Sequence, residues 1–300
     1  MKLAAIDIGS NAARLLITDV YLDSQRKPEF IKSNLIRVPL RLGFDVFETG
    51  EISETRGDHV VSTLKAYKHL LDAYEVLHVK ACATSAMRDA KNSDEIIKRV
   101  QEETGIQIEI ISGDQEASVI FQNHITDSLA KEYSYLYVDV GGGSTELTFF
   151  MNGEMQFRRS FKIGTIRLLK QQVSEQQWDE MKEFIRVNTK TTKKVMAIGS
   201  GGNINKVFSL SKRKEGKPLP LELLRDYYKE FNSMTLPERM SRYKMREDRA
   251  DVIVPALLIY MNVMKWAGAT EILIPKIGLA DGLIHALYDE IVKKALTQSL

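Results

Sequence analysis

Apolar residues along this chain follow two spacings in turn, one typical of β-strands and one of α-helices. In the first part of the chain, four short apolar runs predict strands: residues 3–8, 13–20, 77–83 and 106–111. Between them, apolar side chains recur at helical spacing over 52–75, and residues that favour a helix start precede 94–104. A further helix is expected from near Gln115. Strands that alternate with helices in this way indicate an α/β fold.

The same alternation restarts in the second half of the chain. An apolar run at 136–138 leads through a glycine-rich turn into a second strand from Leu147. The later elements are expected in this order: a helix at 174–190, a strand at 195–198, a helical region after Pro220, a strand at 271–275 and a helix near 281–295. The second half therefore predicts another α/β unit.

The two halves also share a short motif. Residues 6–10 and 138–142 each hold an apolar strand end, an aspartate, one apolar residue and a glycine. This spacing is far longer than any solenoid repeat, so it indicates a duplication on the scale of a domain. We therefore predict two lobes, residues 1–125 and 126–300, with a ligand cleft between their Asp-Gly turns. The helix near 281–295 is expected to pack back on the first lobe.

The composition of the chain bears on its binding partners and its cellular compartment. The formal net charge is +2, which neither demands nor excludes a polyanionic ligand, and we expect no nucleic-acid partner. Cys82 is the only cysteine, which excludes an intrachain disulfide and a thiolate metal cluster and fits a reducing compartment. Asp7 comes too early for a secretory signal, and the longest apolar run, 252–261, is too short to cross a bilayer. We expect a cytoplasmic protein with no membrane partner.

The turn from Asp139 to Glu146 is the most informative stretch of the sequence. Its three consecutive glycines, 141–143, leave backbone N–H groups unscreened, so the turn could wrap an anion closely. The flanking acids would suit a cation or a nucleophilic water. Taken alone, the residues balance this interpretation evenly against an Asx turn at Asp139 with Glu146 facing solvent. The turn matches neither a Walker A loop nor a dinucleotide-binding fingerprint.

Other candidates are individually weak. Glu116 could be an exposed acid in the first turn of a helix, and Arg88 could be an ordinary surface residue. Gly201-Gly202 could bind phosphate at a helix start, although a plain strand-to-helix turn explains them nearly as well. The basic stretch 206–217 is best explained as a solvated loop.

Five motifs in order give these candidates a context. They are Asp7 to Asn11 with Arg14, Ala83 to Arg88, Ile111 to Ala117, Asp139 to Glu146, and Gly199 to Gly202. In this order they resemble the exopolyphosphatase/guanosine pentaphosphate phosphohydrolase (Ppx/GppA) family, over essentially the whole chain. The resemblance implies two actin-like (ribonuclease H-like) lobes, and a short form without the helical C-terminal domains of longer members. It also implies a homodimer.

The resemblance further implies an Mg²⁺-dependent hydrolase that releases terminal orthophosphate from inorganic polyphosphate, or a phosphohydrolase of guanosine pentaphosphate. Glu116 is then the general base, and Asp139 and Glu146 are catalytic acids that hold Mg²⁺. The implied phosphate-binding residues are Gly9, Ser10, Asn11, Arg88, Gly141, Gly142, Gly143, Ser144, Thr145, Gly201 and Gly202. Two positions depart from the family pattern: Ala12, where a hydroxyl is usual, and Ala280, where an arginine is common.

Two rival functions stay open at this stage. A phosphotransferase that uses ATP would need an acceptor, and a non-catalytic sensor would bind guanosine tetra- or pentaphosphate without turnover. The three acids Glu116, Asp139 and Glu146 argue against the sensor, because a protein that only binds an anion gains little from carboxylates beside it.

Overall fold

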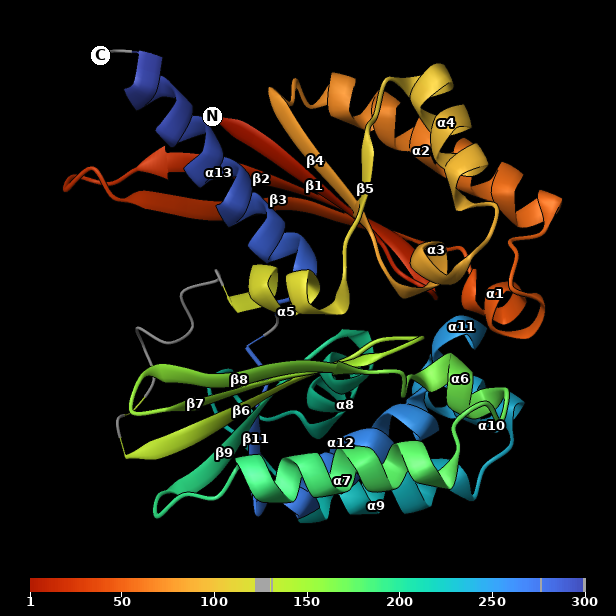
Figure 1. The fold of residues 1–300 in the computed structure, drawn as a ribbon, viewed down its shortest axis with the longest axis vertical. Helices are drawn as coiled ribbons and strands as arrows, with labels where there is room; N and C mark the ends of the chain where they lie inside the picture. Colours follow the sequence, from red (N-terminus) through yellow and green to blue (C-terminus); the bar gives the residue numbers. More distant parts are fainter. Residues whose placement is uncertain (122–129, 131, 276, 299–300) are drawn as a thin grey trace. The chain divides into compact units, whose positions relative to one another are not determined.

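The computed structural model describes residues 1–121, 130, 132–275 and 277–298, and the chain divides into two compact units (Figure 1). The first unit comprises residues 1–123 and 279–300, and the second comprises residues 124–278. Each unit contains one mixed β-sheet flanked by helices, which confirms the predicted α/β fold in two parts.

The sheet of the first unit has five strands in the order β3-β2-β1-β4-β5. Their bounds are β1 Lys2–Ile8, β2 Ala12–Leu22, β3 Pro28–Pro39, β4 His78–Ala83 and β5 Ile108–Ile110. The first three form an antiparallel meander, while β4 and β5 continue parallel to β1. Every residue from Leu3 to Ile8 is buried. A strand buried at consecutive positions is covered on both faces, which explains its unbroken apolar run.

Strand β3 was missed from the sequence. It lies at the edge of the sheet, and most of its side chains are at least partly exposed, so its apolar alternation is weak. A register shift between Ile17 and Thr18 interrupts its pairing with β2. Such an irregularity also discourages pairing of an edge strand with another chain.

Six helices are described in the first unit. They are α1 Gly43–Thr49, α2 Glu54–Ala73, α3 Ser85–Asp89, α4 Ser93–Thr104, α5 Gly113–Phe121 and α13 Leu279–Gln298. Helices α2 and α4 pack against each other, and α13 crosses β1, β2 and β4 and contacts α5 (Figure 1). An ion pair of 2.5 Å joins Asp281 of α13 to Lys32 of β3. The predicted helices over 52–75 and 94–104 are confirmed, with slightly shorter ends for the first.

The sheet of the second unit has six strands in the order β10-β11-β9-β6-β7-β8. Their bounds are β6 Tyr133–Val140, β7 Thr145–Met151, β8 Glu154–Phe161, β9 Lys194–Ser200, β10 Leu219–Pro220 and β11 Glu271–Leu273. Strands β6, β7 and β8 form an antiparallel meander, and β9 and β11 continue parallel to β6. This repeats the order of the first sheet strand for strand, with β10 added at the edge, and so agrees with the duplication that the shared motif predicted.

Seven helices are described in the second unit. They are α6 Thr165–Leu169, α7 Glu175–Asn188, α8 Gly202–Ser211, α9 Leu221–Asn232, α10 Leu236–Tyr243, α11 Glu247–Ala250 and α12 Ile253–Ala267. Helix α12 lies at the centre of the core, where it contacts α6, α7, α8 and α9 as well as β6 and β9.

The segment 247–267 is apolar and long enough, by length and composition, to cross a membrane. However, 61% of its most apolar window is buried within the protein. Nine residues of α12 are buried, among them Ile259, Tyr260 and Val263. A helix that is apolar on most sides is also what the centre of a globular core requires, and this packing accounts for its composition.

Candidate active site

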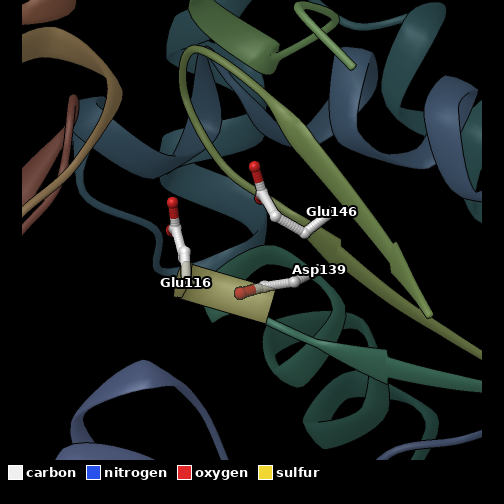
Figure 2. Close-up of side chains that lie close together, drawn as sticks. All are labelled: Glu116, Asp139 and Glu146. Carbon is white, nitrogen blue, oxygen red and sulfur yellow. The ribbon is translucent and has the colours of Figure 1, made fainter. Parts of the chain in front are cut away.

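Strand pairing brings Asp139 and Glu146 face to face in the second unit. Asp139 near the end of β6 lies directly opposite Glu146 on β7, and a carboxylate oxygen of one is within 4.8 Å of a carboxylate oxygen of the other. Figure 2 shows both side chains extending from these neighbouring strands. Glu146 is only 1% exposed. Like charges opposite each other destabilise an antiparallel pair, so this arrangement favours a cation between the two carboxylates.

The row that holds these acids continues on both sides. Ser160 on β8 lies opposite Glu146 and donates a hydrogen bond of 2.8 Å to its Oε1 atom. Ser200 on β9 lies beside Asp139 and is fully buried. The four residues therefore form one line across the sheet, with the two carboxylates in the middle and a hydroxyl at each end. Oxygen atoms of this kind are the ligands that a hard divalent cation prefers.

The glycine-rich turn joins the two acid-bearing strands. It closes through a hydrogen bond of 2.9 Å from the N–H of Gly141 to the carbonyl of Ser144. Thr145 is fully buried, and its hydroxyl donates a bond of 2.6 Å to the carbonyl of Ile163. Because a hydroxyl has one proton, the Thr145 side chain cannot donate to a ligand while it makes this bond.

A second turn, between β9 and α8, lies against Asp139. Gly201 has a φ of 104°, which side chains rarely adopt, and a Cβ atom there would lie 3.2 Å from Oδ1 of Asp139. The next carbonyl, that of Gly202, accepts a hydrogen bond from the guanidinium of Arg249. A Cβ atom at Gly202 would come within 2.8 Å of that guanidinium. Gly201 is therefore required by its backbone conformation, whereas a side chain at Gly202 would have to displace the Arg249 guanidinium.

Tyr260 of α12 supports this turn from the core. Its hydroxyl donates to the carbonyl of Ser200. Burial raises the pKa of Tyr260 well above its usual value, and the nearby charge of Asp139 raises it further. The phenol therefore stays a neutral hydrogen-bond donor at the base of the acid row.

The first unit has its own turn at the corresponding place, between β1 and β2. The N–H of Gly9 donates to the carbonyl of Ala12 across 3.1 Å, which closes the turn. The buried hydroxyl of Ser10 lies 2.8 Å from that of Ser85, at the start of α3. The turn predicted to bind phosphate is thus tied to the strand-to-helix turn after β4.

Arg88 and Glu116 lie on neighbouring elements of the first unit. Arg88 of α3 donates a bond of 2.6 Å to the carbonyl of Ile111, immediately before the turn that leads into α5. Glu116 lies in the first turn of α5, is 8% exposed, and is also drawn in Figure 2. The side chains of Ser112 and Gln115 form reciprocal bonds with each other's N–H groups, of 3.2 and 2.7 Å, which fix the start of the helix.

A sequence profile of the Ppx/GppA phosphatase family matches residues 34–290. The chain belongs to the Ppx/GppA phosphatase family. The bifunctional 3-dehydroquinate synthase/phosphatase of Fusobacterium nucleatum is 28% identical over 97% of this chain and 47% of its own length. Exopolyphosphatase 2 of Mycobacterium tuberculosis is 32% identical over 56% of this chain and 53% of its own length. The chain spans about half the length of these curated relatives.

Solved structures of the Ppx/GppA family match the chain along nearly its whole length. The family member from Aquifex aeolicus has a TM-score of 0.73 and 28% identity, and the match covers 98% of both chains. An exopolyphosphatase from Cytophaga hutchinsonii has a TM-score of 0.81 and 26% identity, over 97% of this chain and 98% of its own. The family resemblance derived from the five motifs is therefore confirmed.

Within this Ppx/GppA chain, several residues around the two turns were missed from the sequence. Ser160, Tyr260 and Arg167 lie outside the glycine-rich motifs, and no spacing rule links them to the acids. Only strand register places Ser160 beside Glu146, and only tertiary packing places Tyr260 beneath Asp139. The contact of Arg249 with Gly202 likewise depends on the fold.

Proposed function

We propose that this chain is an exopolyphosphatase, a phosphoanhydride hydrolase that releases orthophosphate from the end of inorganic polyphosphate. The observation that carries the proposal is the pairing of Asp139 with Glu146 beside a glycine-rich turn. Supporting it, relatives named exopolyphosphatase share 28–32% identity with parts of the chain. Guanosine pentaphosphate carries the same type of anhydride bond and is the competing substrate within the same reaction class.

In this proposal Asp139 and Glu146 hold Mg²⁺, because two carboxylates that face each other offer the oxygen ligands and the negative charge that a hard divalent cation prefers. When bound, such an ion offsets negative charge on the phosphoryl oxygens. Backbone N–H groups of residues 142–144 and the Ser144 hydroxyl bind the terminal phosphate, whereas the N–H of Gly141 closes the turn. Ser10, Asn11, Arg88 and Gly201-Gly202 supply further donors, whereas the N–H of Gly9 already donates to the carbonyl of Ala12.

Glu116 acts as the general base in this proposal. It would accept a proton from the attacking water as the water oxygen bonds to the terminal phosphorus and the bridging P–O bond breaks. Glu116 is suited to this role because it lies at a fixed helix start and is largely shielded from bulk water. Asp114, two residues earlier on the same helix, is exposed and offers a matched control.

Phosphate release from short polyphosphate, long polyphosphate and guanosine pentaphosphate, measured side by side with Mg²⁺, tests the proposal. We expect the highest kcat/KM on polyphosphate, loss of activity with a chelator, and its return with Mg²⁺. Glu116→Gln should lower kcat by about a hundredfold or more, the usual contribution of a general base, while Asp114→Asn stays near the wild type. Release from none of the substrates would contradict the hydrolase, and a fully active Glu116→Gln variant would remove Glu116 as the base.

A further inference from the structure

In the second unit, the start of α6, which follows β8, holds the glycine-rich turn through hydrogen bonds to its carbonyl groups. The N–H of Thr165 donates to the carbonyl of Gly141 across 3.0 Å, and the N–H of Ile166 donates to that of Gly142 across 2.8 Å. The guanidinium Nε of Arg167 donates to the carbonyl of Gly143 across 2.8 Å. Three consecutive carbonyls of the turn are thus held by three consecutive residues of α6.

The approach of this segment is as close as backbone atoms allow. A Cβ atom at Gly164 would lie 2.4 Å from the carbonyl oxygen of Gly142 and 2.5 Å from the carbonyl carbon of Gly143. No side chain fits there without moving the turn. Gly164 therefore lets the start of α6 reach the turn, and the three hydrogen bonds then hold it in place.

These three hydrogen bonds determine the direction of the N–H groups in the glycine-rich turn. In a trans peptide unit the C=O of one residue and the N–H of the next point in opposite directions. Because the carbonyls of residues 141–143 are directed toward α6, the N–H groups of residues 142–144 are directed away from it. A row of N–H groups with one shared direction is a binding surface for an anion such as phosphate.

The first unit holds its turn in the same way, again with the segment after its third strand. The N–H of Gly43 donates to the carbonyl of Ser10 across 2.9 Å. The N–H groups of Leu40 and Arg41 donate to the carbonyl of Asn11 across 3.1 and 2.9 Å. By the same peptide geometry, the N–H groups of Asn11 and Ala12 are directed away from residues 40–43.

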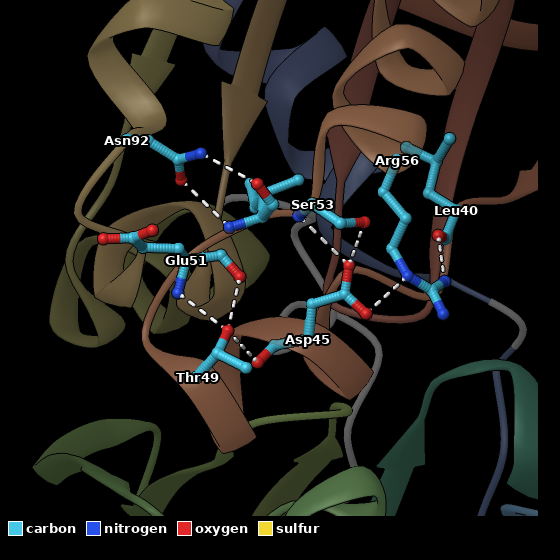
Figure 3. Close-up of polar contacts among 8 residues, drawn as sticks. Leu40, Asp45, Thr49, Glu51, Ser53, Arg56 and Asn92 are labelled. Carbon is cyan, nitrogen blue, oxygen red and sulfur yellow. Dashed lines mark hydrogen bonds and ion pairs between the residues drawn. The ribbon is translucent and has the colours of Figure 1, made fainter.

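We call the contact of residues 40–43 with the turn of the first unit the first clamp, and the contact of α6 with the glycine-rich turn the second clamp. An arginine also supports the first clamp, but indirectly. Nη1 of Arg56 on α2 donates to the carbonyl of Leu40 across 3.0 Å, and its Nε donates to Asp45 across 2.7 Å (Figure 3). Asp45 also accepts bonds from the hydroxyl and the N–H of Ser53, of 2.5 and 3.1 Å. These contacts join the loop 40–43 to the start of α2.

We propose that Arg167 and Arg56 are positioning residues for phosphate binding, each holding the carbonyl side of one turn so that its N–H side keeps a fixed shape. The inference rests on the proposed function, in which these two turns bind the phosphates of the substrate. Arg167 contacts its turn directly, whereas Arg56 acts through Leu40. The substitution of Arg167 should therefore have the larger effect.

The test measures the binding of tripolyphosphate by calorimetry, with every variant made in a Glu116→Gln background to suppress turnover. Loss of one charged hydrogen bond predicts that Arg167→Ala weakens binding by about tenfold, and Arg56→Ala, acting indirectly, by about threefold. Arg167→Lys keeps the charge and one donor and should recover most of the loss. Arg225→Ala removes an exposed arginine of α9, which pairs only locally with Glu222, and should bind like the parent.

Two further measurements separate positioning from other roles of the same arginine. A long-range charge effect is screened by salt, whereas a change in turn geometry is not, so the tenfold difference should persist at about 0.5 M salt. In the catalytic background, KM for polyphosphate should rise while kcat changes much less. A difference that vanishes in salt, or a fall in kcat with unchanged KM, would overturn the inference.

Equal affinities of the parent and Arg167→Ala would also overturn it, whether or not the wild type releases phosphate. If the wild type releases no phosphate but the affinities follow the predicted order, the hydrolase proposal fails and the positioning inference stands. Should Arg167→Ala not fold, as judged from its melting transition, Arg56→Ala decides the question by the same measurements.

Discussion

The two sheets place different charges at the same position of the same topology. In the first unit, Asp7 on β1 lies opposite Arg14 on β2, and an ion pair of 2.5 Å joins them. In the second unit, Asp139 on β6 lies opposite Glu146 on β7. Both aspartates are two residues before the first glycine of the turn that follows their strand. The duplicated fold therefore contains one row that pairs opposite charges and one that pairs like charges.

This difference separates a structural position from a candidate catalytic one. Asp7 is 3% exposed, and Arg14 supplies the positive charge that a buried carboxylate needs. The acids of the second row face hydroxyls at Ser160 and Ser200, which donate hydrogen bonds at most and bring no charge. The second row thus sets two like charges opposite each other, which favours a cation between them, whereas the first row pairs opposite charges.

Both rows have a buried tyrosine beneath them. Tyr67 of α2 donates a hydrogen bond of 3.1 Å to the carbonyl of Ala13, and Tyr260 of α12 donates to that of Ser200. In each case burial raises the pKa of the phenol, and the charge of the nearby aspartate, Asp7 or Asp139, raises it further. The support is therefore shared by the two units, and the partner of the aspartate is what differs.

The largest expected effect comes from removing one acid of the row that pairs like charges. Asp139→Asn should lower phosphate release by about a thousandfold, because metal-held charge on the phosphoryl group contributes several kcal/mol to such reactions. The same substitution should stabilise the protein in a chelator by about 0.5 kcal/mol, since it relieves a pair of like charges. Urea unfolding with and without chelator measures the second effect, with the exposed Asp179→Asn as a control.

Opposite signs for activity and stability are the informative part of this prediction. If Asp139→Asn instead destabilises the protein in chelator, the carboxylate already has a favourable partner within the chain. The contrast between the two rows would then be lost.

The row that pairs Asp7 with Arg14 should respond in the opposite direction. Arg14→Met leaves the buried Asp7 without its ion pair and should destabilise the protein by about 2 kcal/mol, less than for a fully buried pair because Arg14 is partly exposed. The double variant Asp7→Asn/Arg14→Met should recover part of this loss, because it removes the uncompensated charge. Urea unfolding of the single and double variants measures the coupling; additive losses would mean that the pair is not the cause.

The sequence alone predicted much of this fold, because long apolar runs and helical spacing survive wherever an element is buried on one or both faces. Strand β1 and helix α2 belong to this class. Strand β3 and the short helices α1 and α6 do not, since they are exposed or only one or two turns long. The recurring Asp-Gly motif predicted the duplication, but not the order of the strands, which depends on pairing between distant segments.

The residues of the candidate site also fall into those that could be predicted from the sequence and those that could not. Residues of the glycine-rich motifs could be selected from the sequence, because glycine where backbone atoms approach closely and acids beside it have a local signature. The clamp residues Arg167 and Arg56 could not, because each acts through a carbonyl that is distant in the sequence. Thr145 shows the converse: it matched the motif as a phosphate donor, yet its hydroxyl donates to Ile163.

The smallest expected effect is a difference between the two clamps in how their contribution to stability changes at low pH. Asp45 belongs to the first clamp, and its pKa lies below the ordinary value of 3.8: burial raises it, but hydrogen bonds from Ser53 and Arg56 lower it more. A carboxyl whose folded pKa is depressed contributes stability above its unfolded pKa and loses that stability as the pH falls through the folded value. The second clamp joins Arg167 to a backbone carbonyl, and neither group titrates in this range.

Urea unfolding between pH 7 and pH 3 should therefore separate Asp45→Asn from Arg167→Ala. At pH 7 each should be less stable than the wild type by about 1 kcal/mol, the usual contribution of a charged hydrogen bond at a partly exposed site. Below about pH 4 the difference between the wild type and Asp45→Asn should shrink, because protonation removes the charge that the substitution removes. The difference for Arg167→Ala should stay constant. If both differences shrink together, acid acts on the fold as a whole, and the first clamp has no pH response of its own.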